Sequence, residues 1–417
     1  MVTGSGRGLP DEQGYVEWLT EQVAERVRRE VREDMPLIEC GLDSVALLGL
    51  YGEAEEAFGP LPDHPLEVWP YTTIRNLARR LAGRDRALRS DGRIRTALVF
   101  TGQGCQHPRM TEGLHRHCTA YRHHLAAADA ALAPHLGRSV VELVRGGDPL
   151  IHQTELAQPA LFAVGYALAM TLLEEGVEPV AVLGHGVGEF AAATVSGALP
   201  LAAAAELVAC RGAFMQHLPV GGGMMATCAD PFEAAEAATS EPGVSIGAIN
   251  AARATVLSGD IAGLERARRR LADLGIASTF LKVTHAFHSP LMEPVAPRLE
   301  ALARRMPVTA PTIPYYSTVY GREYDGPLDA GYWSRQITSP VRFADAARAL
   351  LAEQRPSHVV EIGPQAVLTP FLRRMGGPRG PRCLTVCRDP HTNAVDLAGT
   401  LSALNAGPLA NDETTPD

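Results

Sequence analysis

The sequence predicts a multidomain chain in which an all-α helix bundle precedes a larger α/β segment. Its 417 residues are enough for two or three domains, each with its own core. Near the N-terminus, apolar residues recur at helical spacing. From residue 96 onward, short β-rich runs alternate with helical patterns. Within this segment, residues 224 to 283 follow the order β-α-β-β-α-β, which is typical of the ferredoxin-like fold.

Composition narrows the class of protein. The net charge of -9 disfavours a nucleic-acid binder, whose affinity comes largely from basic contacts to phosphates. The seven cysteines are scattered and odd in number, which favours free thiols over a disulfide scaffold. We expect no apolar run of membrane-spanning length and no signal peptide, and therefore a soluble, cytoplasmic protein without a membrane partner.

The N-terminal region is expected to form a small helix bundle over residues 12–84. A first helix over 15–31 is indicated by apolar residues three or four apart, namely Val16, Leu19, Val23, Val27 and Val31. Further helices are expected over 44–58 and 72–81. A charged stretch at 85–95 has no periodicity and is interpreted as a linker. The first dozen residues are Gly-rich and polar, and we expect them to be disordered.

The second helix of this bundle begins at Gly41-Leu42-Asp43-Ser44. A serine at a helix start exposes its hydroxyl, and the helix N-terminus favours a phosphate placed there. The run resembles the attachment site of acyl and peptidyl carrier proteins, which implies a covalent 4′-phosphopantetheine on Ser44 and a phosphopantetheinyl transferase as partner. Glu53, Glu55 and Glu56 would form the acidic face of such a carrier. The alternative is that Ser44 is only a helix cap.

The larger segment is arranged around Leu183-Gly184-His185-Gly186-Val187-Gly188-Glu189. A short apolar run, 179–183, precedes it, and a helical pattern begins at Phe190. Strand, tight glycine turn and helix together are the setting of a nucleophile elbow, which presents a serine or cysteine at its tip. Here the tip residue is Gly186, which has neither a hydroxyl nor a thiol.

A series of short motifs follows in order between residues 96 and about 390. They are Phe100-Thr-Gly-Gln-Gly-Cys-Gln, Gln158-Pro-Ala, the elbow run, Arg211-Gly-Ala-Phe-Met-Gln216, His285-Ala286-Phe287-His288-Ser289, Tyr332-Trp333, Pro340-Val-Arg-Phe343 and Glu361-Ile-Gly-Pro364. Together they resemble the malonyl-CoA:acyl carrier protein transacylases and the acyltransferase domains of polyketide synthases. The resemblance implies an α/β-hydrolase-like large subdomain at 96–222 and 284–405 and a ferredoxin-like small subdomain at 223–283. Residues 406–417 are expected to be a mobile tail.

The resemblance also implies a two-step reaction. In that family the elbow serine, activated by a histidine, takes an acyl group from coenzyme A, and the pantetheine thiol of a carrier then removes it. His288 would be the base. The backbone N–H groups of Gln103 and Val187 would form the oxyanion hole. The one departure is Gly186, which stands at the position of the nucleophilic serine.

Substrate binding is implied by the same motifs. Arg211 would hold the free carboxylate of a dicarboxylic acyl group, because its planar guanidinium matches that geometry. His185, His285 and Phe287 would complete the substrate site. In this family, His-Ala-Phe-His goes with malonyl, and a pocket discriminates against an extra methyl by only roughly 1–3 kcal/mol.

No metal is expected, since the spacing matches no ligand pattern at His115, His117, Cys118, His123 and His124, or at Cys383 and Cys387.

Three hypotheses follow from Gly186. The chain is a malonyl transferase fused to its carrier, in which transfer is lost or slow. Alternatively, it is a non-catalytic module that binds acyl-CoA or acyl carriers, or Gly186 was introduced to trap a complex. The partners expected are malonyl-CoA, a carrier domain in cis or in trans, and polyketide synthase proteins. Cys105 is a less favoured replacement nucleophile, and Thr194 and Ser196 are too far along their helix at about 1.5 Å per residue.

Overall fold

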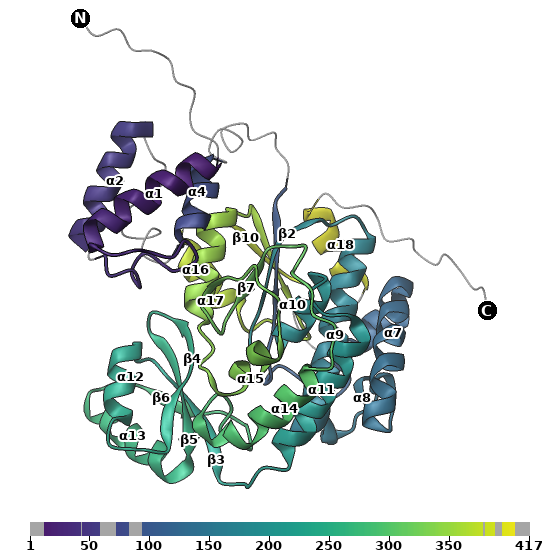
Figure 1. The fold of residues 1–417 in the computed structure, drawn as a ribbon. Helices are drawn as coiled ribbons and strands as arrows, with labels where there is room; N and C mark the ends of the chain where they lie inside the picture. Colours follow the sequence, from purple (N-terminus) through teal and green to yellow (C-terminus); the bar gives the residue numbers. More distant parts are fainter. Residues whose placement is uncertain are drawn as a thin grey trace, which may run out of the picture. The chain divides into compact units, whose positions relative to one another are not determined.

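The computed structural model describes residues 12–42, 44–58, 72–82, 94–377, 380–387 and 394–404. The chain divides into two compact units, one comprising residues up to 93 together with 348–355 and the other the remainder (Figure 1). Each unit is described by itself. The expected disorder before residue 12, the linker up to residue 93 and the tail at 406–417 lie outside the described residues.

The first unit contains helices α1 (Glu12–Val27), α2 (Ser44–Phe58) and α4 (Ile74–Ala82). They bury one apolar core, to which α1 contributes Leu19 and Val23 at 0% exposure. The helix expected over 15–31 ends earlier, at Val27, because Arg28 adopts a left-handed backbone with φ 53°. Val31 nevertheless packs against the same core from outside the helix. The expected helices over 44–58 and 72–81 are present, the second displaced by one or two residues.

The second unit is built on a six-stranded sheet of order β10-β9-β1-β2-β7-β8. Its central strand β1 is fully buried and parallel to both neighbours, as expected for a sheet whose two faces are covered. Only the edge strand β8 runs antiparallel. The strands are β1 (Thr96–Phe100), β2 (Pro179–Gly184), β7 (Tyr315–Ser317), β8 (Arg322–Glu323), β9 (His358–Ile362) and β10 (Arg382–Thr385).

Helices pack around this sheet (Figure 1). They are α6 (Glu112–His117), α7 (Thr119–Leu136), α8 (Val140–Arg145), α9 (Thr154–Glu174), α10 (Gly188–Val195), α11 (Leu201–Gln216), α14 (Ala296–Ala303), α15 (Ala330–Thr338), α16 (Phe343–Gln354), α17 (Thr369–Gly376) and α18 (Ala394–Ala403), with 3-10 turns η2 (Pro149–His152) and η3 (Pro290–Val295). Helix α17 begins at Thr369. The carboxylate of Glu361 accepts the backbone N–H groups of Val367, Leu368 and Thr369, which fixes that start.

Helix α9 corrects one expectation. By length and composition it is apolar enough to cross a membrane, contrary to the expectation that no run of that length occurs. Of its most apolar stretch, 83% is buried inside the unit. The helix lies among other elements of the second unit, and a central helix covered by protein needs the same apolar surface as one covered by lipid.

A second, four-stranded sheet lies within this unit. Its elements are β3 (Gly222–Thr227), α12 (Pro231–Ala238), β4 (Val244–Ala251), β5 (Ala254–Asp260), α13 (Ile261–Asp273) and β6 (Ser278–Phe280). All pairings are antiparallel, and the strand order is β4-β5-β3-β6. Its core is formed by residues of both helices and three strands, including Met225, Leu257 and Leu264 at 0% exposure. The elements occur in the order that the sequence pattern indicates.

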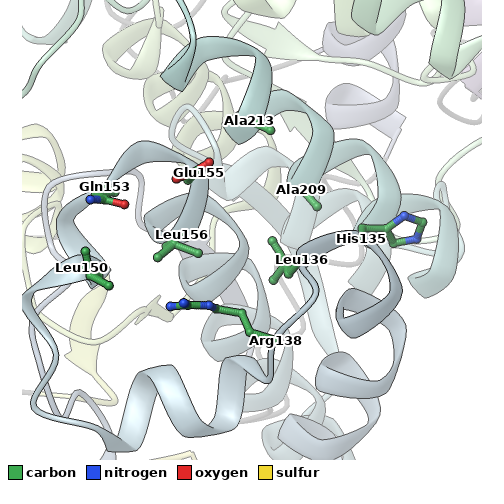
Figure 2. Close-up of a pocket in the computed structure, with 9 residues that line it drawn as sticks. All are labelled: His135, Leu136, Arg138, Leu150, Gln153, Glu155, Leu156, Ala209 and Ala213. Carbon is green, nitrogen blue, oxygen red and sulfur yellow. The ribbon is translucent and has the colours of Figure 1, made fainter.

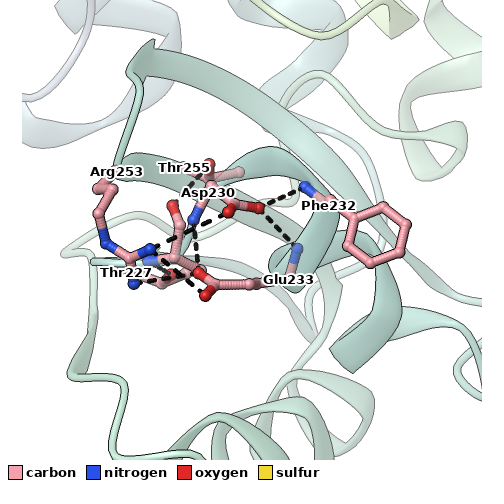
Figure 3. Close-up of polar contacts among 7 residues, drawn as sticks. Thr227, Asp230, Phe232, Glu233, Arg253 and Thr255 are labelled. Atoms are coloured by element: carbon pink, nitrogen blue, oxygen red, sulfur yellow. Dashed lines mark hydrogen bonds and ion pairs between the residues drawn. The ribbon is translucent and has the colours of Figure 1, made fainter.

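Helix α12 begins with a complete capping box (Figure 3). One carboxylate oxygen of Asp230 accepts the backbone N–H groups of Phe232 and Glu233, both at 2.9 Å. The Glu233 carboxylate accepts the N–H of Asp230 in return, also at 2.9 Å. Arg253 adds an exposed ion pair with Glu233. These bonds satisfy amides that the first helical turn would otherwise leave without partners.

We predict that Asp230→Ala lowers the free energy of unfolding by about 1 kcal/mol, because the capping oxygen is lost. Urea titration of the full chain measures it. The matched control is Glu236→Ala, on an exposed position of the same helix, which should leave the free energy of unfolding within about 0.5 kcal/mol of the parent chain. Equal effects of the two substitutions would show that the capping box is not what stabilises this helix start.

Candidate active site

The turn between β2 and α10 has glycine at three positions, two of which are too close to other backbone atoms for a side chain. A Cβ on Gly184 would lie 2.3 Å from the backbone nitrogen of Glu189, and one on Gly188 would lie 2.6 Å from the carbonyl oxygen of Thr101. Gly186 instead has a left-handed backbone, with φ 56°. A Cβ built there meets a single atom within 4 Å, Nε2 of His288, at 3.4 Å. The tip of the turn therefore faces one imidazole nitrogen.

His288 is held so that this nitrogen is an acceptor. Its Nδ1–H donates to the carbonyl oxygen of Ser339 at 3.1 Å, which leaves the lone pair of the neutral ring on Nε2. The residue is 8% exposed. Burial, with smaller contributions from the positive charge of Arg211 and from His185, lowers the pKa of His288 to about 3. The ring is thus neutral at physiological pH and can take up a proton at Nε2.

The loop after β1 crosses the turn at very short range. A Cβ on Gly102 would lie 2.5 Å from the carbonyl oxygen of His185, so only glycine fits. The side chain of Gln103, next in the loop, is held by Gln158 and Thr154. Among the described residues, neither the backbone N–H of Gln103 nor that of Val187 donates a hydrogen bond. Both amides are available to a ligand, and Val187 precedes the N-terminus of α10.

Arg211 is a buried cation on α11, with 2% exposure. Its Nη1 donates to Oε1 of Gln158 at 2.7 Å, and its guanidinium carbon lies 5.9 Å from the centre of the Phe190 ring. The Nε–H has no hydrogen-bond partner among the described side chains. Burial lowers the pKa of Arg211 to about 10, against the opposing effect of Glu189, so it stays charged at neutral pH. A buried guanidinium with an unused donor is suited to an anion.

Glu189, in the first turn of α10, is hydrogen-bonded to the residue that follows β7 and to a tyrosine of α15. Its Oε1 accepts the backbone N–H of Thr318 at 2.7 Å, the Thr318 hydroxyl at 3.0 Å and the Tyr332 hydroxyl at 3.0 Å. The residue is completely buried. Burial raises the pKa of Glu189 to about 7, although these hydrogen bonds favour the ionised form. The carboxyl therefore holds the elbow helix against β7 and α15.

The three remaining residues expected in the substrate site have mainly protein partners. His185 donates from Nε2 to Oδ1 of Asn250 on β4, at 2.8 Å. His285 accepts the Thr284 hydroxyl at Nδ1 and donates from Nε2 to the Leu218 carbonyl. Phe287 is buried, with its ring centre 6.1 Å from that of His285. His185 directly precedes Gly186 in the chain, and His285 and Phe287 lie just before His288.

Residues that the sequence did not single out complete the geometry. Gln336 on α15 donates from Nε2 to the carbonyl oxygen of Gly186 at 2.8 Å. Ser339 fixes His288, and Val341 just beyond it pairs with Ala248 of the small sheet. Gln336 and Gly186 are 150 positions apart, so no local pattern could have paired them. Two nearby motifs, Tyr332-Trp333 and Pro340-Val-Arg-Phe343, pointed to this segment.

The other candidate groups lie apart from this arrangement. The Cys105 thiol donates to Thr101 and to the Gly102 carbonyl, and burial raises its pKa to about 12, so it is not a thiolate at neutral pH. In the His115–His124 segment, His124 pairs with Glu174 at 2.7 Å. No group of metal-binding side chains occurs in the part of the chain that the structure describes. Ser44 begins α2, and its side chain lies outside what the structure describes.

A separate cavity of about 280 Å³ lies between α7, η2, α9 and α11 (Figure 2). Arg138 and His135 stand at one side of it, and Gln153 and Glu155 at the other. None of the residues around Gly186 lines it.

The fold is that of a known domain family. Residues 97–394 match the acyl transferase domain family, and residues 17–81 match the phosphopantetheine attachment site. The chain therefore belongs to the acyl transferase domain family and carries an acyl-carrier region in front of that domain.

Known proteins agree with this assignment. The chain is 40% identical over 288 residues to a phenolphthiocerol synthesis polyketide synthase of Mycobacterium marinum, and 37% identical over 297 residues to polyketide synthase GfsB of Streptomyces halstedii. These matches cover 68% and 70% of the chain but only 14% and 5% of those much longer relatives.

Solved structures match the acyltransferase part over nearly their whole length. A loading acyltransferase from the avermectin modular polyketide synthase aligns with a TM-score of 0.69 and 32% identity, covering 75% of this chain and 100% of that one. The malonyl-CoA:acyl carrier protein transacylase of Xanthomonas oryzae aligns with a TM-score of 0.65 and 30% identity, covering 74% and 98%.

The raised pKa of Glu189 predicts a pH-dependent stability. Between about pH 4.5 and 7 the folded chain binds more protons at this carboxyl than the unfolded chain, so the free energy of unfolding falls as pH rises. Glu189→Gln removes this decline. We expect the parent chain to lose roughly 1–3 kcal/mol more than the variant between pH 5 and pH 8 in urea titrations. Glu236→Gln, at an exposed position, is the control, and parallel curves for Glu189→Gln and the parent would contradict the assignment.

Proposed function

We propose that this chain binds malonyl-CoA and is built to transfer malonyl to the thiol of a phosphopantetheinyl carrier, with covalent catalysis impaired by Gly186. The observation that supports it best is the place of His288 Nε2, 3.4 Å from where a Cβ at 186 would lie. A serine there would put its hydroxyl within hydrogen-bond reach of a neutral imidazole, which is the arrangement that activates a nucleophile.

Other groups near this position support the proposal. In the part of the chain that the structure describes, the amides of Gln103 and Val187 donate to no protein group, and they would hold the oxyanion of a tetrahedral intermediate. Arg211 offers a buried positive charge and an unused N–H to the malonyl carboxylate. His185, His285 and Phe287 would shape the acyl pocket. What Gly186 removes is the acceptor for the first half of the reaction, since no acyl-enzyme ester can form on it.

The carrier region supplies the acceptor thiol in this proposal. Ser44 at the start of α2 would carry the 4′-phosphopantetheine, attached by a phosphopantetheinyl transferase. The carrier is loaded in cis or in trans, in the cytoplasm and with polyketide synthase partners. We also assign the ferredoxin-like class to residues 223–283, which the β4-β5-β3-β6 order supports, and the α/β-hydrolase-like class to the large subdomain.

A non-catalytic acyl-CoA or acyl-carrier binding module is the second candidate. Gly186 also favours this candidate, because a glycine supplies no nucleophile, while Arg211 and the amides of Gln103 and Val187 could still bind an acyl thioester. The two candidates differ in whether the carrier thiol ever acquires malonyl from malonyl-CoA.

Gly186→Ser should restore covalent catalysis. We predict malonyl transfer to carrier at least about 10³-fold faster than in the parent chain, because a serine nucleophile and its base act as one unit. Radiolabelled malonyl-CoA measures the transfer, and intact-protein mass spectrometry detects the acyl-enzyme. The matched control is Gly186→Ser combined with His288→Ala, which should lose the gain. A parent chain that already transfers as fast as Gly186→Ser would contradict impaired catalysis.

Phosphopantetheinylation should occur at Ser44 and nowhere else. Incubation with a phosphopantetheinyl transferase and coenzyme A should add a single phosphopantetheine mass to the full chain. The Ser44→Ala variant should add none, because it lacks the acceptor hydroxyl. An unchanged mass gain in Ser44→Ala would place the arm at another residue.

A further inference from the structure

Gly186 leaves the space in front of His288 without a side chain. A Cβ built on Gly186 finds only Nε2 of His288 within 4 Å, and Nδ1 is already committed to the Ser339 carbonyl. Nε2 is therefore an acceptor that faces the position of a nucleophile. A water molecule occupies about 30 Å³ in the liquid, small enough to enter where a serine side chain would stand. Gly186 itself is buried, and its carbonyl is anchored by Gln336.

The same geometry disfavours a carrier thiol as the direct nucleophile. Coenzyme A and the carrier present the same group, a thiol at the end of a pantetheine arm. In the two-step route they use the site in turn, because the acyl group waits on serine. Without that serine, acyl-CoA would have to stay bound while a second arm reached the same buried histidine, which is 8% exposed. Water needs no second arm.

We infer that the chain catalyses hydrolysis of malonyl-CoA, with water attacking the thioester at the position that Gly186 leaves open. This inference rests on the proposed function for the binding of malonyl-CoA. One O–H bond of water breaks as its proton moves to Nε2 of His288, and a C–O bond forms at the thioester carbonyl. The carbonyl oxygen takes the negative charge and lies against the amides of Gln103 and Val187.

The tetrahedral intermediate then collapses. The C–S bond breaks, and the proton on Nε2 passes to the departing sulfur. The products are malonate and free coenzyme A, with no oxidant or second cofactor required. His288 ends the cycle neutral, as its burial and the positive charge of Arg211 favour.

The test uses the full chain in its apo form, checked by intact mass, with malonyl-CoA as the probe. Release of free thiol and of malonate is followed under single-turnover conditions, and malonyl-CoA binding is measured by calorimetry on every variant. We expect His288→Ala to lower the hydrolysis rate about 10²-fold or more, since it removes the proton acceptor. His217→Ala, which changes an exposed histidine on the segment after α11, should hydrolyse at the parent rate.

A second variant is needed because His288→Ala could lose hydrolysis by misfolding. Gly186→Ala puts a Cβ 3.4 Å from Nε2, in the place assigned to water, and should also lose hydrolysis. Hydrolysis at the uncatalysed rate in a chain that binds malonyl-CoA, an equal rate in His288→Ala, or a malonyl adduct on the protein before malonate appears would each overturn the inference and leave the proposed binding intact. Absence of malonyl-CoA binding would overturn both.

Discussion

The site depends on a very close approach between two backbone segments. The loop after β1 and the turn after β2 touch at distances that only glycine permits, at Gly102 and Gly188. Parallel pairing of β1 with β2 brings the carboxyl ends of both strands to the same edge, where ligands bind in open α/β sheets. That approach places the amides of Gln103 and Val187 at one site. The side-chain contacts described next hold the turn in the position that the pairing of β1 with β2 sets.

Side chains from distant parts of the chain then fix the elbow in three directions. Gln336 holds the Gly186 carbonyl, and Glu189 holds the first turn of α10 against Thr318 and Tyr332. His185 reaches Asn250 on the small sheet. None of these bonds requires a side chain at 186. Glycine suits the left-handed backbone at that position, where φ is 56°.

Local patterns were enough to predict the three helices of the first unit, the strand and helix of the elbow, and all six elements around the small sheet, because periodicity and turn residues act over short distances. They failed at the end of the first helix, which stops at Val27 and not at Val31 because Arg28 has a left-handed backbone. The expectation that no run reaches membrane-spanning length was also wrong, because the apolarity of α9 reflects its burial among other elements. In the site, the motifs singled out Arg211 and His288 as candidates, whereas Gln336, Ser339 and Asn250 act through contacts across many residues, which one sequence does not reveal.

The central claim is that a site for a dicarboxylic acyl thioester persists around Gly186. The most direct test compares malonyl-CoA with acetyl-CoA, which lacks the second carboxylate, by calorimetric titration of the unaltered chain. With Arg211 buried and one N–H unused, malonyl-CoA should bind at least about 10-fold more tightly, a difference of about 1.4 kcal/mol. Equal affinity for the two thioesters, or no binding of either, would contradict the account.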